Sequence, residues 1–288
     1  NPYLFEMANI RDQCSWVHMY EHEKATRKAM DLVRMAVAKA RLLEPLRKGR
    51  VPVEKAALVI GGGLSGMVAA LDLANQGFSV WLAEKERELG GNLRRVRYLL
   101  TAEDPREGLD SLMEEVRKNK SIRLFTDAKI ESVDGSIGNF KTKLSTNGDV
   151  HELRHGVVVV ATGASEHAPT EYLYGADPGV LTQLELEARL AGESPASLPR
   201  AVVMIQCVGS RDAQRPYCSR VCCSEAIKNA LRIKQLSPDT AVYVLFRDIR
   251  AYGFNETYYT RARQKGVVFV RYEEDRKPEV SRSGDRLE

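Results

Sequence analysis

Four of the five cysteines in this sequence lie within 17 residues of one another, and their spacing is the clearest chemical signal in the chain. They form the pattern C-x10-C-x3-C-C, made of Cys207, Cys218, Cys222 and Cys223. Four thiolates are the usual ligand set of a [4Fe–4S] cluster. A disulfide scaffold would instead be short, with its cysteines spread along the chain. We therefore predict that these four cysteines bind a [4Fe–4S] cluster.

Other uses of these cysteines stay open from the sequence alone. A dithiol–disulfide enzyme would normally show C-x2-C or C-x4-C beside its flavin, and no such pair occurs outside the clustered cysteines. A structural zinc site usually uses two C-x2–4-C pairs, which the adjacent Cys222 and Cys223 fit poorly. Inert buried thiols are the third alternative. Cys14 stands alone, and it is either an ordinary buried thiol or one ligand of a second cluster.

A glycine-rich turn is the second signal. The residues GGGLSG at positions 61–66 satisfy G-x-G-x-x-G, directly after an apolar run and at the start of an expected helix. The first glycine permits a tight turn, the second lets a pyrophosphate approach the backbone, and the third lets helix and strand pack closely. The helix N-terminus offers free N–H groups to phosphates. We predict that a dinucleotide is bound by Gly61, Gly63, Leu64, Ser65 and Gly66.

An acidic residue follows the next apolar run, as a dinucleotide site requires. Glu84 lies 18 residues after Gly66, where a carboxylate can accept hydrogen bonds from both ribose hydroxyls. Its charge also disfavours a 2′-phosphate. We include the neighbouring Lys85 in the cofactor-binding set. The alternative is a purely structural glycine turn with an exposed Glu84.

Two further segments favour FAD over NAD. Gly90, Gly91 and Asn92 follow Glu84 closely, which completes an E-x5-G-G element. A second apolar run ends about 100 residues after the glycine turn in Ala161, Thr162 and Gly163. An E-x5-G-G element with a distal A-T-G resembles the pattern of flavoproteins that have two dinucleotide-binding domains. We therefore predict FAD as the cofactor, with these six residues in its site.

A second strand–helix–strand unit begins at residues 201–205 but lacks the phosphate-binding glycines. The residues that follow are QCVGS, with one glycine. In flavoproteins of the kind above, this unit binds a nicotinamide nucleotide. We predict that here it does not bind NAD(P)H and that its longer connection carries the cysteines. Three arginines of this connection either offset cluster charge or line a solvated loop: Arg211, Arg215 and Arg220.

Apolar periodicity predicts the elements that position these residues. The expected strands are 56–60, 78–83, 157–161, 201–205, 241–246 and 267–272, with 56–60, 157–161 and 201–205 buried. The expected helices are 21–46, the segment from the glycine turn to Gln76, 107–118, 224–235 and 256–264. Four short strands, at 122–125, 129–133, 140–144 and 150–153, predict an antiparallel meander. The expected fold class is α/β, with two Rossmann-like βαβ units, an inserted meander and a helical N-terminal segment.

Composition excludes several classes of protein. Lysine and arginine number 43 against 39 acidic residues, a net charge of +4 that gives no argument for nucleic-acid binding. Hydrophobic residues make up 43%, which excludes a disordered chain. No apolar run reaches the roughly 18 residues that a membrane span requires. The chain starts at Asn1 without a signal-peptide pattern, and we expect a piece of a longer protein.

The length suggests about two domains, at roughly 150 residues each. We expect three parts: a helical segment over 1–50, an FAD-binding domain over 51–198, and a degenerate second Rossmann-like domain over 199–288 that carries the cysteines.

With both motifs in view, the sequence resembles the A-type subunit of heterodisulfide reductase and its bacterial relatives. The stretches that carry the resemblance include VIGGGLSGMVAALDLANQGF and VVMIQCVGSRDAQRPYCSRVCCSEAIKNA, and they are part of a match over nearly the whole chain. The resemblance implies the thioredoxin-reductase-like FAD part of an iron–sulfur flavoprotein. It also implies that the family's cluster cysteines are Cys207, Cys218, Cys222 and Cys223.

The same resemblance implies an electron-transfer subunit of a cytoplasmic complex in which no side chain acts as acid or base. In that family, FAD splits an electron pair that comes from a hydrogenase or formate dehydrogenase partner. One electron goes towards ferredoxin, and the other passes through B- and C-type subunits to a disulfide, the mixed disulfide of coenzymes M and B in methanogenesis. We expect a homo-oligomer within the larger complex, without nucleic acid or a membrane span. The family's ferredoxin-like C-x2-C-x2-C motifs are absent from this sequence.

Two other functions remain open. An NAD(P)H-dependent flavin disulfide oxidoreductase would have its flavin bleached by NADH alone, and the missing second glycine turn argues against it. A non-catalytic scaffold stabilised by a metal would be colourless, without iron or flavin.

Overall fold

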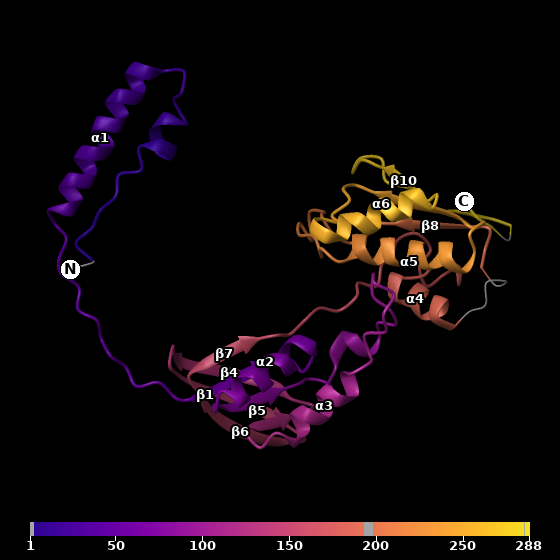
Figure 1. Cartoon of the computed structure of the whole chain (residues 1–288), viewed down its shortest axis with the longest axis horizontal. Coiled ribbons are helices and arrows are strands. Elements are labelled where there is room, and N and C mark those ends of the chain that lie inside the picture. Colours follow the sequence, from indigo (N-terminus) through magenta and orange to yellow (C-terminus); the bar gives the residue numbers. More distant parts are fainter. Residues whose placement is uncertain (1–2, 193–197, 285) are drawn as a thin grey trace. The chain divides into compact units, whose positions relative to one another are not determined.

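The structure, a computed structural model, describes residues 3–192, 198–284 and 286–288 (Figure 1). The chain divides into two compact units, Asn1–Pro52 and Val53–Glu288. In the first, a short π-helix η1 (Arg11–Ser15) packs against α1 (His22–Ala40). The predicted helix over 21–46 therefore ends six residues early. Pro45 prevents the helix from reaching residue 46, because a proline disfavours helical geometry in the residue before it.

The first sheet of the larger unit is parallel throughout, with the order β3-β2-β1-β7. Its strands are β1 (Ala56–Ile60), β2 (Ser79–Ala83), β3 (Ile122–Phe125) and β7 (Val157–Val160). Helix α2 (Leu64–Asn75) connects β1 to β2, and α3 (Leu109–Lys118) precedes β3. The short 3-10 helix η2 (Gly91–Arg94) lies between β2 and α3. This arrangement is the first of the two predicted βαβ units.

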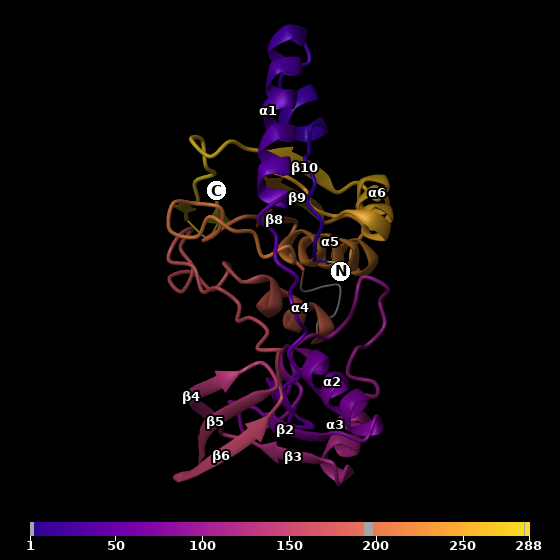
Figure 2. The same cartoon turned by 90° about the vertical axis from the view of Figure 1, so that its left-hand side faces the viewer.

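Different elements pack on the two faces of this sheet (Figure 2). Side chains alternate between the faces of a strand. Val59 and Leu82 pack with residues of α2 and α3, whereas Leu58 packs with Leu144 and Leu153 of a separate antiparallel sheet. The result is three layers, with helices on one face, the parallel sheet in the middle and the meander on the other face. This layering leaves the carboxyl ends of β1 and β7 free for the glycine turn.

The meander has three strands, not the four that were predicted. They are β4 (Lys129–Ser136), β5 (Asn139–Thr146) and β6 (Asp149–His155), paired in chain order. The segment Ile122–Phe125 instead joins the parallel sheet beside β2. The reason is the helix before it, because a strand–helix–strand connection returns the chain to the same sheet.

The second sheet, in the order β10-β9-β8, is also parallel. It consists of β8 (Ala201–Ile205), β9 (Ala241–Phe246) and β10 (Val268–Arg271). Its core is formed with α4 (Gln183–Gly192), α5 (Cys222–Leu236) and α6 (Glu256–Gln264). Sequence periodicity missed α4. The remaining short elements are η4 (Gly253–Asn255), β11 (Arg282–Ser283) and β12 (Arg286–Leu287).

The predictions of buried strands at 157–161 and 201–205 were wrong. In β7, Val160 is 71% exposed, and in β8, Val203 is 55% exposed. Both strands lie at the edge of their sheets. A continuous apolar run in these strands therefore does not show that both faces of the strand are buried. No helix among the described residues combines the length and the apolar character needed to cross a membrane.

Candidate functional site

The glycine turn lies between the carboxyl end of β1 and the start of α2. A Cβ at Gly61 would overlap the carbonyl oxygen of Ala161, and a Cβ at Gly66 would overlap that of Gly61. A Cβ at Gly63 would meet no atom of the described residues within 4 Å. Two glycines are thus required for close backbone packing, while Gly63 leaves open space before the helix. Leu64 and Ser65 are the first residues of that helix and are exposed.

Glu84 is buried beneath this turn and is anchored by the backbone. Its Oε2 accepts a hydrogen bond from the N–H of Gly62 at 2.6 Å, and its Oε1 accepts one from the N–H of Glu86 at 2.8 Å. Each carboxylate oxygen can accept a second hydrogen bond, so the group can still receive ribose hydroxyls. The neighbouring Lys85 points to solvent and pairs with Glu86 at 3.6 Å.

The Gly90–Gly91 pair lies against the glycine turn at residues 61–66. Gly90 forms an isolated parallel bridge with Gly63, and its N–H donates to the carbonyl of Gly62 at 2.8 Å. A Cβ at Gly91 would lie 3.3 Å from the Cα of Gly63. The side chain of Asn92 donates to the carbonyl of Ala164 at 2.7 Å, just beyond the A-T-G segment. Segments that are distant in the sequence therefore meet at one point.

The A-T-G segment, residues 161–163, also lies beside the glycine turn. The N–H of Ala161 donates to the carbonyl of Ile60 at 2.8 Å, so the segment continues beside β1 after β7 ends. Thr162 and Gly163 are exposed there. The structure thus brings together the four segments that the sequence analysis named, at the carboxyl ends of parallel strands. In open α/β sheets, this is the edge where ligands bind.

Three of the four clustered cysteines also come together. Cys207 lies two residues after the end of β8, and Cys222 and Cys223 are the first residues of α5. Hydrogen bonds from the Cys223 side chain, from the Ser219 hydroxyl and from the N–H of Cys207 lower the pKa of the Cys222 thiol. The same contact with Cys222, together with burial, raises the pKa of Cys223. Cys222 is therefore the cysteine of this pair that more readily becomes a thiolate.

Cys218 is not brought to the other three. Its sulfur accepts a hydrogen bond from the N–H of Arg220 at 3.3 Å. Within the described ranges, no group of three or more histidine, cysteine or acidic side chains is positioned to hold a metal ion. The donor set has the chemistry that a cluster requires, but four-sulfur ligation would need the loop between Cys207 and Cys222 to rearrange.

That loop has an unusual backbone. Four of its residues have positive φ angles: Cys207, Gly209, Arg211 and Arg220. Left-handed residues within a loop can turn successive N–H groups inward, an arrangement seen at phosphate and iron–sulfur sites. Arg211 also lies with Nη1 4.0 Å from the sulfur of Cys207 while its Nη2 donates to Asp248 at 2.7 Å. The guanidinium of Arg215 contacts the carbonyl of Gly209 at 3.3 Å.

Sequence reasoning missed a buried polar network that ties helices α4 and α5 to the segment at residues 97–98. Lys228 of α5 pairs with Glu187 of α4 at 2.8 Å, with both side chains almost fully buried. Glu187 also accepts hydrogen bonds from the N–H groups of Arg97 and Tyr98, and the Tyr98 hydroxyl donates to Asn229 at 2.8 Å. The segment after the second glycine pair is thereby tied to the helix that begins with Cys222. Charged residues in helices look like surface residues in a sequence, so no sequence signal marked them.

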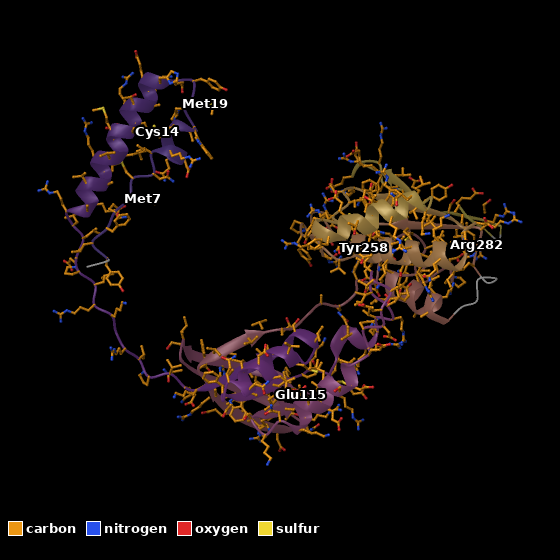
Figure 3. The ribbon with its side chains drawn as sticks, viewed as in Figure 1. Met7, Cys14, Met19, Glu115, Tyr258 and Arg282 are labelled. Atoms are coloured by element: carbon orange, nitrogen blue, oxygen red, sulfur yellow. The ribbon has the colours of Figure 1, made fainter. Side chains whose placement is uncertain are left out.

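Cys14 belongs to the N-terminal unit, where η1 packs on α1 (Figure 3). It is buried, and its thiol donates to the carbonyl of Ala25 at 2.8 Å. His18 contacts Lys28 at 3.0 Å and Glu21 at 3.3 Å. These contacts fit the ordinary buried thiol, the first of the two alternatives for Cys14.

Comparison with known proteins places the chain among redox enzymes. Residues 55–198 match the family described as pyridine nucleotide-disulphide oxidoreductase. The A subunit of H(2):CoB-CoM heterodisulfide,ferredoxin reductase from Methanothermobacter thermautotrophicus is 36% identical, over 94% of this chain and 55% of that protein. An A-type iron-sulfur subunit of CoB–CoM heterodisulfide reductase from Methanopyrus kandleri is 35% identical, over 94% of this chain and 56% of its own length.

The chain thus spans about half the length of the curated relatives that it matches. The aligned region has 365 positions and this chain has 288 residues, so the relatives carry residues within the matched region that this chain lacks. Among solved structures, thioredoxin reductase from T. acidophilum aligns with a TM-score of 0.47 and 15% identity, over 81% of this chain and 69% of that one.

Proposed function

The chain belongs to the pyridine nucleotide-disulphide oxidoreductase family, and from this premise we propose that it is the FAD-bearing, electron-transferring part of a heterodisulfide reductase-type complex. The narrower assignment is supported by relatives that match nearly the whole chain and carry that name. It is also supported by the cysteine pattern, which the family model does not include, since the matched residues end at 198.

A single observation carries the FAD proposal: the two glycine elements, Glu84 and the A-T-G segment meet at one sheet edge. When bound there, FAD supplies the capacity to take up two electrons together and release them singly. The N-terminus of α2 and the open space at Gly63 would hold the pyrophosphate. Glu84 would accept hydrogen bonds from the ribose, and the Gly90–Gly91 backbone would lie beside the phosphates.

The four clustered cysteines, on this proposal, hold a [4Fe–4S] cluster. Support comes from the lowered pKa of Cys222, from the convergence of Cys207, Cys222 and Cys223, and from Arg211 beside Cys207. A basic side chain beside the thiolates offsets part of the negative charge of such a cluster. In this chain, the residues bind and orient the group and tune it through burial and hydrogen bonds.

The second βαβ unit, on the same proposal, does not bind a nicotinamide nucleotide. Gln206, Cys207 and Val208 stand where a second glycine turn would start, and each carries a side chain where the close approach of a pyrophosphate to the backbone favours glycine. Gln206 is the residue directly after β8, the place that Gly61 takes directly after β1.

We place the chain in a cytoplasmic, oligomeric complex with B- and C-type subunits, ferredoxin and a hydrogenase or formate dehydrogenase-type donor. Electrons enter as pairs and leave singly, one towards ferredoxin and one towards a disulfide. Two pairs therefore reduce one disulfide to two thiols, with uptake of two protons, and send two electrons to ferredoxin. The names of the relatives, which include a ferredoxin- and F(420)H(2)-dependent reductase subunit, support this chemistry.

The test is the cofactor content of anaerobically purified protein, comparing wild type with Cys222→Ser and with Cys14→Ser as the matched control. We expect bound flavin in all three and about four iron and four sulfide per chain in wild type and Cys14→Ser. Cys222→Ser should lose iron and keep flavin. Unchanged iron in Cys222→Ser would refute the ligand assignment.

The competing activity is a pyridine-nucleotide-dependent flavin reductase. NADH added anaerobically to the purified protein should leave the flavin absorbance unchanged. Rapid bleaching by NADH alone would replace the proposal with that activity. A colourless protein without iron or flavin would replace it with a scaffold.

A further inference from the structure

Helix α1 of the N-terminal unit carries an apolar stripe that stays exposed in the described part of that unit. Met30, Val33 and Val37 are 50%, 44% and 55% exposed. Their spacing of three and four residues places them on one face of the helix. Valine lowers helix propensity because its branched side chain is restricted in a helix. Two exposed valines on this face therefore indicate a surface that packs against something else.

The stripe is separate from the face of α1 that packs within the unit. The carbonyl of Ala25 accepts the Cys14 thiol of η1 at 2.8 Å, and Leu32, two turns further along on the same side, is half-buried. Val33 is the next residue, so it lies about 100° further round the helix. The contact with η1 thus leaves the stripe uncovered.

A row of arginines runs along one flank of the stripe. Arg27, Arg34 and Arg41 are spaced by seven residues, so they lie in line, about two turns apart. All three side chains are exposed. Arg34 pairs with Asp31 at 3.0 Å, but an exposed pair of this kind contributes little and can exchange its partner. The other flank of the stripe consists of alanines, at positions 29 and 36.

The excess of positive charge in this chain belongs to the same unit. Between Lys24 and Arg50 the chain has nine basic residues and two acidic ones. Residues 1–52 as a whole have ten basic and six acidic residues, an excess equal to the +4 of the entire chain. Complementary charge favours association, so the surface around the stripe suits an acidic partner.

We propose that α1 docks an amphipathic helix of another protein, whose apolar residues pack on the stripe and whose carboxylates pair with the arginine row. A narrow stripe with residues three and four apart is the seam along which two helices pack. Charges beside such a seam select the partner and its orientation. The proposal goes beyond the proposed function and does not depend on its cofactors.

Two other occupants match the surface less closely. A second copy of α1 brings no carboxylate to the arginine row, because from Arg27 to Arg41 the flanks of the stripe hold arginine and alanine. A helix that lies in a membrane surface has a broad apolar face, rich in leucine and aromatic residues. The stripe of α1 is narrow and has basic residues along one flank.

The experiment measures the binding of two labelled peptides to the 288-residue chain by fluorescence anisotropy. Both peptides are amphipathic helices with a leucine seam. One has glutamates beside the seam, and the other has lysines at the same positions. The chain should bind the glutamate peptide and not the lysine peptide.

Reversal of the arginine row tests the charge selection. Arg27→Glu, Arg34→Glu and Arg41→Glu combined should weaken binding of the glutamate peptide about tenfold or more, because each attraction becomes a repulsion of similar size. The same variant should gain binding of the lysine peptide. The matched control combines three reversals at exposed residues beyond α1 and should keep the wild-type preference: Arg47→Glu, Lys48→Glu and Arg50→Glu.

A second variant tests the apolar stripe without disturbing the helix. Val33→Ala combined with Val37→Ala removes most of the seam, and alanine is the better helix former. Weaker binding of the glutamate peptide in this variant is expected, and it cannot result from an unfolded α1. Chain that lacks iron or flavin should give the same result, so failure of the proposed function leaves this test intact.

Equal affinity for the two peptides, binding of neither, or wild-type affinity in the Val33→Ala, Val37→Ala variant would overturn the proposal. Arginine-dependent binding to vesicles of phosphatidylcholine and phosphatidylglycerol, without peptide binding, would overturn it in favour of a membrane surface. Self-association in sedimentation that the two alanine substitutions abolish would overturn it in favour of a second copy.

Discussion

The glycines of the first turn differ in what a side chain at each position would meet. At Gly66 the new Cβ would overlap a backbone oxygen, whereas at Gly63 it would enter open space. Gly63 also has an ordinary extended backbone, with φ −75° and ψ −177°, that alanine can adopt. Substitutions at these two positions therefore separate folding from cofactor binding.

Gly63→Ala should leave the stability of the flavin-free protein unchanged and weaken FAD binding, because the methyl group occupies the space before the helix N-terminus. Gly66→Ala should lower stability by about 1–3 kcal/mol, the usual cost of overpacking. Thermal unfolding of the apoprotein and fluorescence titration with FAD measure both effects. FAD affinity equal to wild type in Gly63→Ala would show that no phosphate lies against this glycine.

Glu84 combines burial with two backbone hydrogen bonds that hold its carboxylate under the turn. Glu84→Gln should reduce FAD affinity about tenfold or more, since hydrogen bonds to a charged group contribute about 1.5–3 kcal/mol. Flavin retained after desalting provides the measurement. Glu86→Gln is the matched control, because the Glu86 side chain is exposed and its carboxylate pairs with the exposed Lys85. Equal losses in the two variants would contradict a specific role for Glu84.

Helix α5 carries two cysteines at its start and a buried lysine on its second turn, so its position depends on an ion pair as well as on apolar packing. Lys228 contacts Glu187 at 2.8 Å and Glu225 at 2.7 Å, and it lies 5.2 Å from the centre of the Tyr98 ring. Burial raises the pKa of Glu225 and of Tyr98. A buried carboxylate depends on its partner, which makes this cluster sensitive to the loss of either charge.

Lys228→Met should therefore destabilise the protein by about 3–5 kcal/mol, since it leaves the buried Glu187 without a counter-charge. Urea unfolding followed by circular dichroism measures the change. The control is Lys118→Met, which breaks an exposed pair with Glu114 and should cost about 0.3–0.5 kcal/mol. Similar losses in both variants would mean that the buried pair contributes no more than a surface pair.

The meander contains a buried histidine that makes stability depend on pH. His155 is bonded through Nδ1 to the carbonyl of Val157 at 3.0 Å and through Nε2 to the Thr142 hydroxyl at 2.8 Å. Burial lowers its pKa. The unfolded chain, with a histidine pKa of about 6.5, then binds a proton that the folded chain does not. The free energy of unfolding should fall as pH drops below about 6.5 and should level off above it.

His155→Gln should flatten this dependence between about pH 7.5 and about pH 5.5, the range around the ordinary histidine pKa, although it lowers stability at neutral pH through lost packing. Urea unfolding at several pH values gives the slope. His151→Gln, on the same strand, is the control and should keep the wild-type slope. A slope unchanged by His155→Gln would assign the pH dependence to other groups.

At the scale of the whole molecule, every candidate site lies in one of the two units. The turn at 61–66, the clustered cysteines and the buried network all belong to Val53–Glu288. Its first residues are part of that unit, because the N–H of Glu54 donates to the carbonyl of Gly138 at 2.9 Å. The N-terminal unit has its own packing around Cys14.

A chain that starts at Val53 should consequently fold and keep the flavin content and the unfolding midpoint of the longer chain. Flavin absorbance and thermal unfolding of the shortened protein test this expectation. Loss of flavin on removal of residues 1–52 would show that the N-terminal unit contributes to the site.

Much of the FAD half could be predicted from local patterns. The turn at 61–66, Glu84 and the Gly90–Gly91 pair were named from spacing, and they lie together in the structure. The strand at 122–125 was misassigned because a run of four residues does not show which sheet it joins. The helix over 183–192 was missed because its acidic residues obscure its apolar face, and one of them, Glu187, is buried.

The sequence by itself determined the glycine turn, the acidic partner and the spacing of the cysteines, because these depend on residue type and on neighbours along the chain. Only the tertiary structure decided which charges are buried, which strands lie at an edge and which cysteines meet. Those properties join residues far apart in sequence, such as Glu187 and Lys228, and depend on what each face packs against. The burial of Gln206 is also a property that only the tertiary structure decided. Its side-chain amide is buried and has no hydrogen-bond partner among the described residues, which the sequence alone does not reveal.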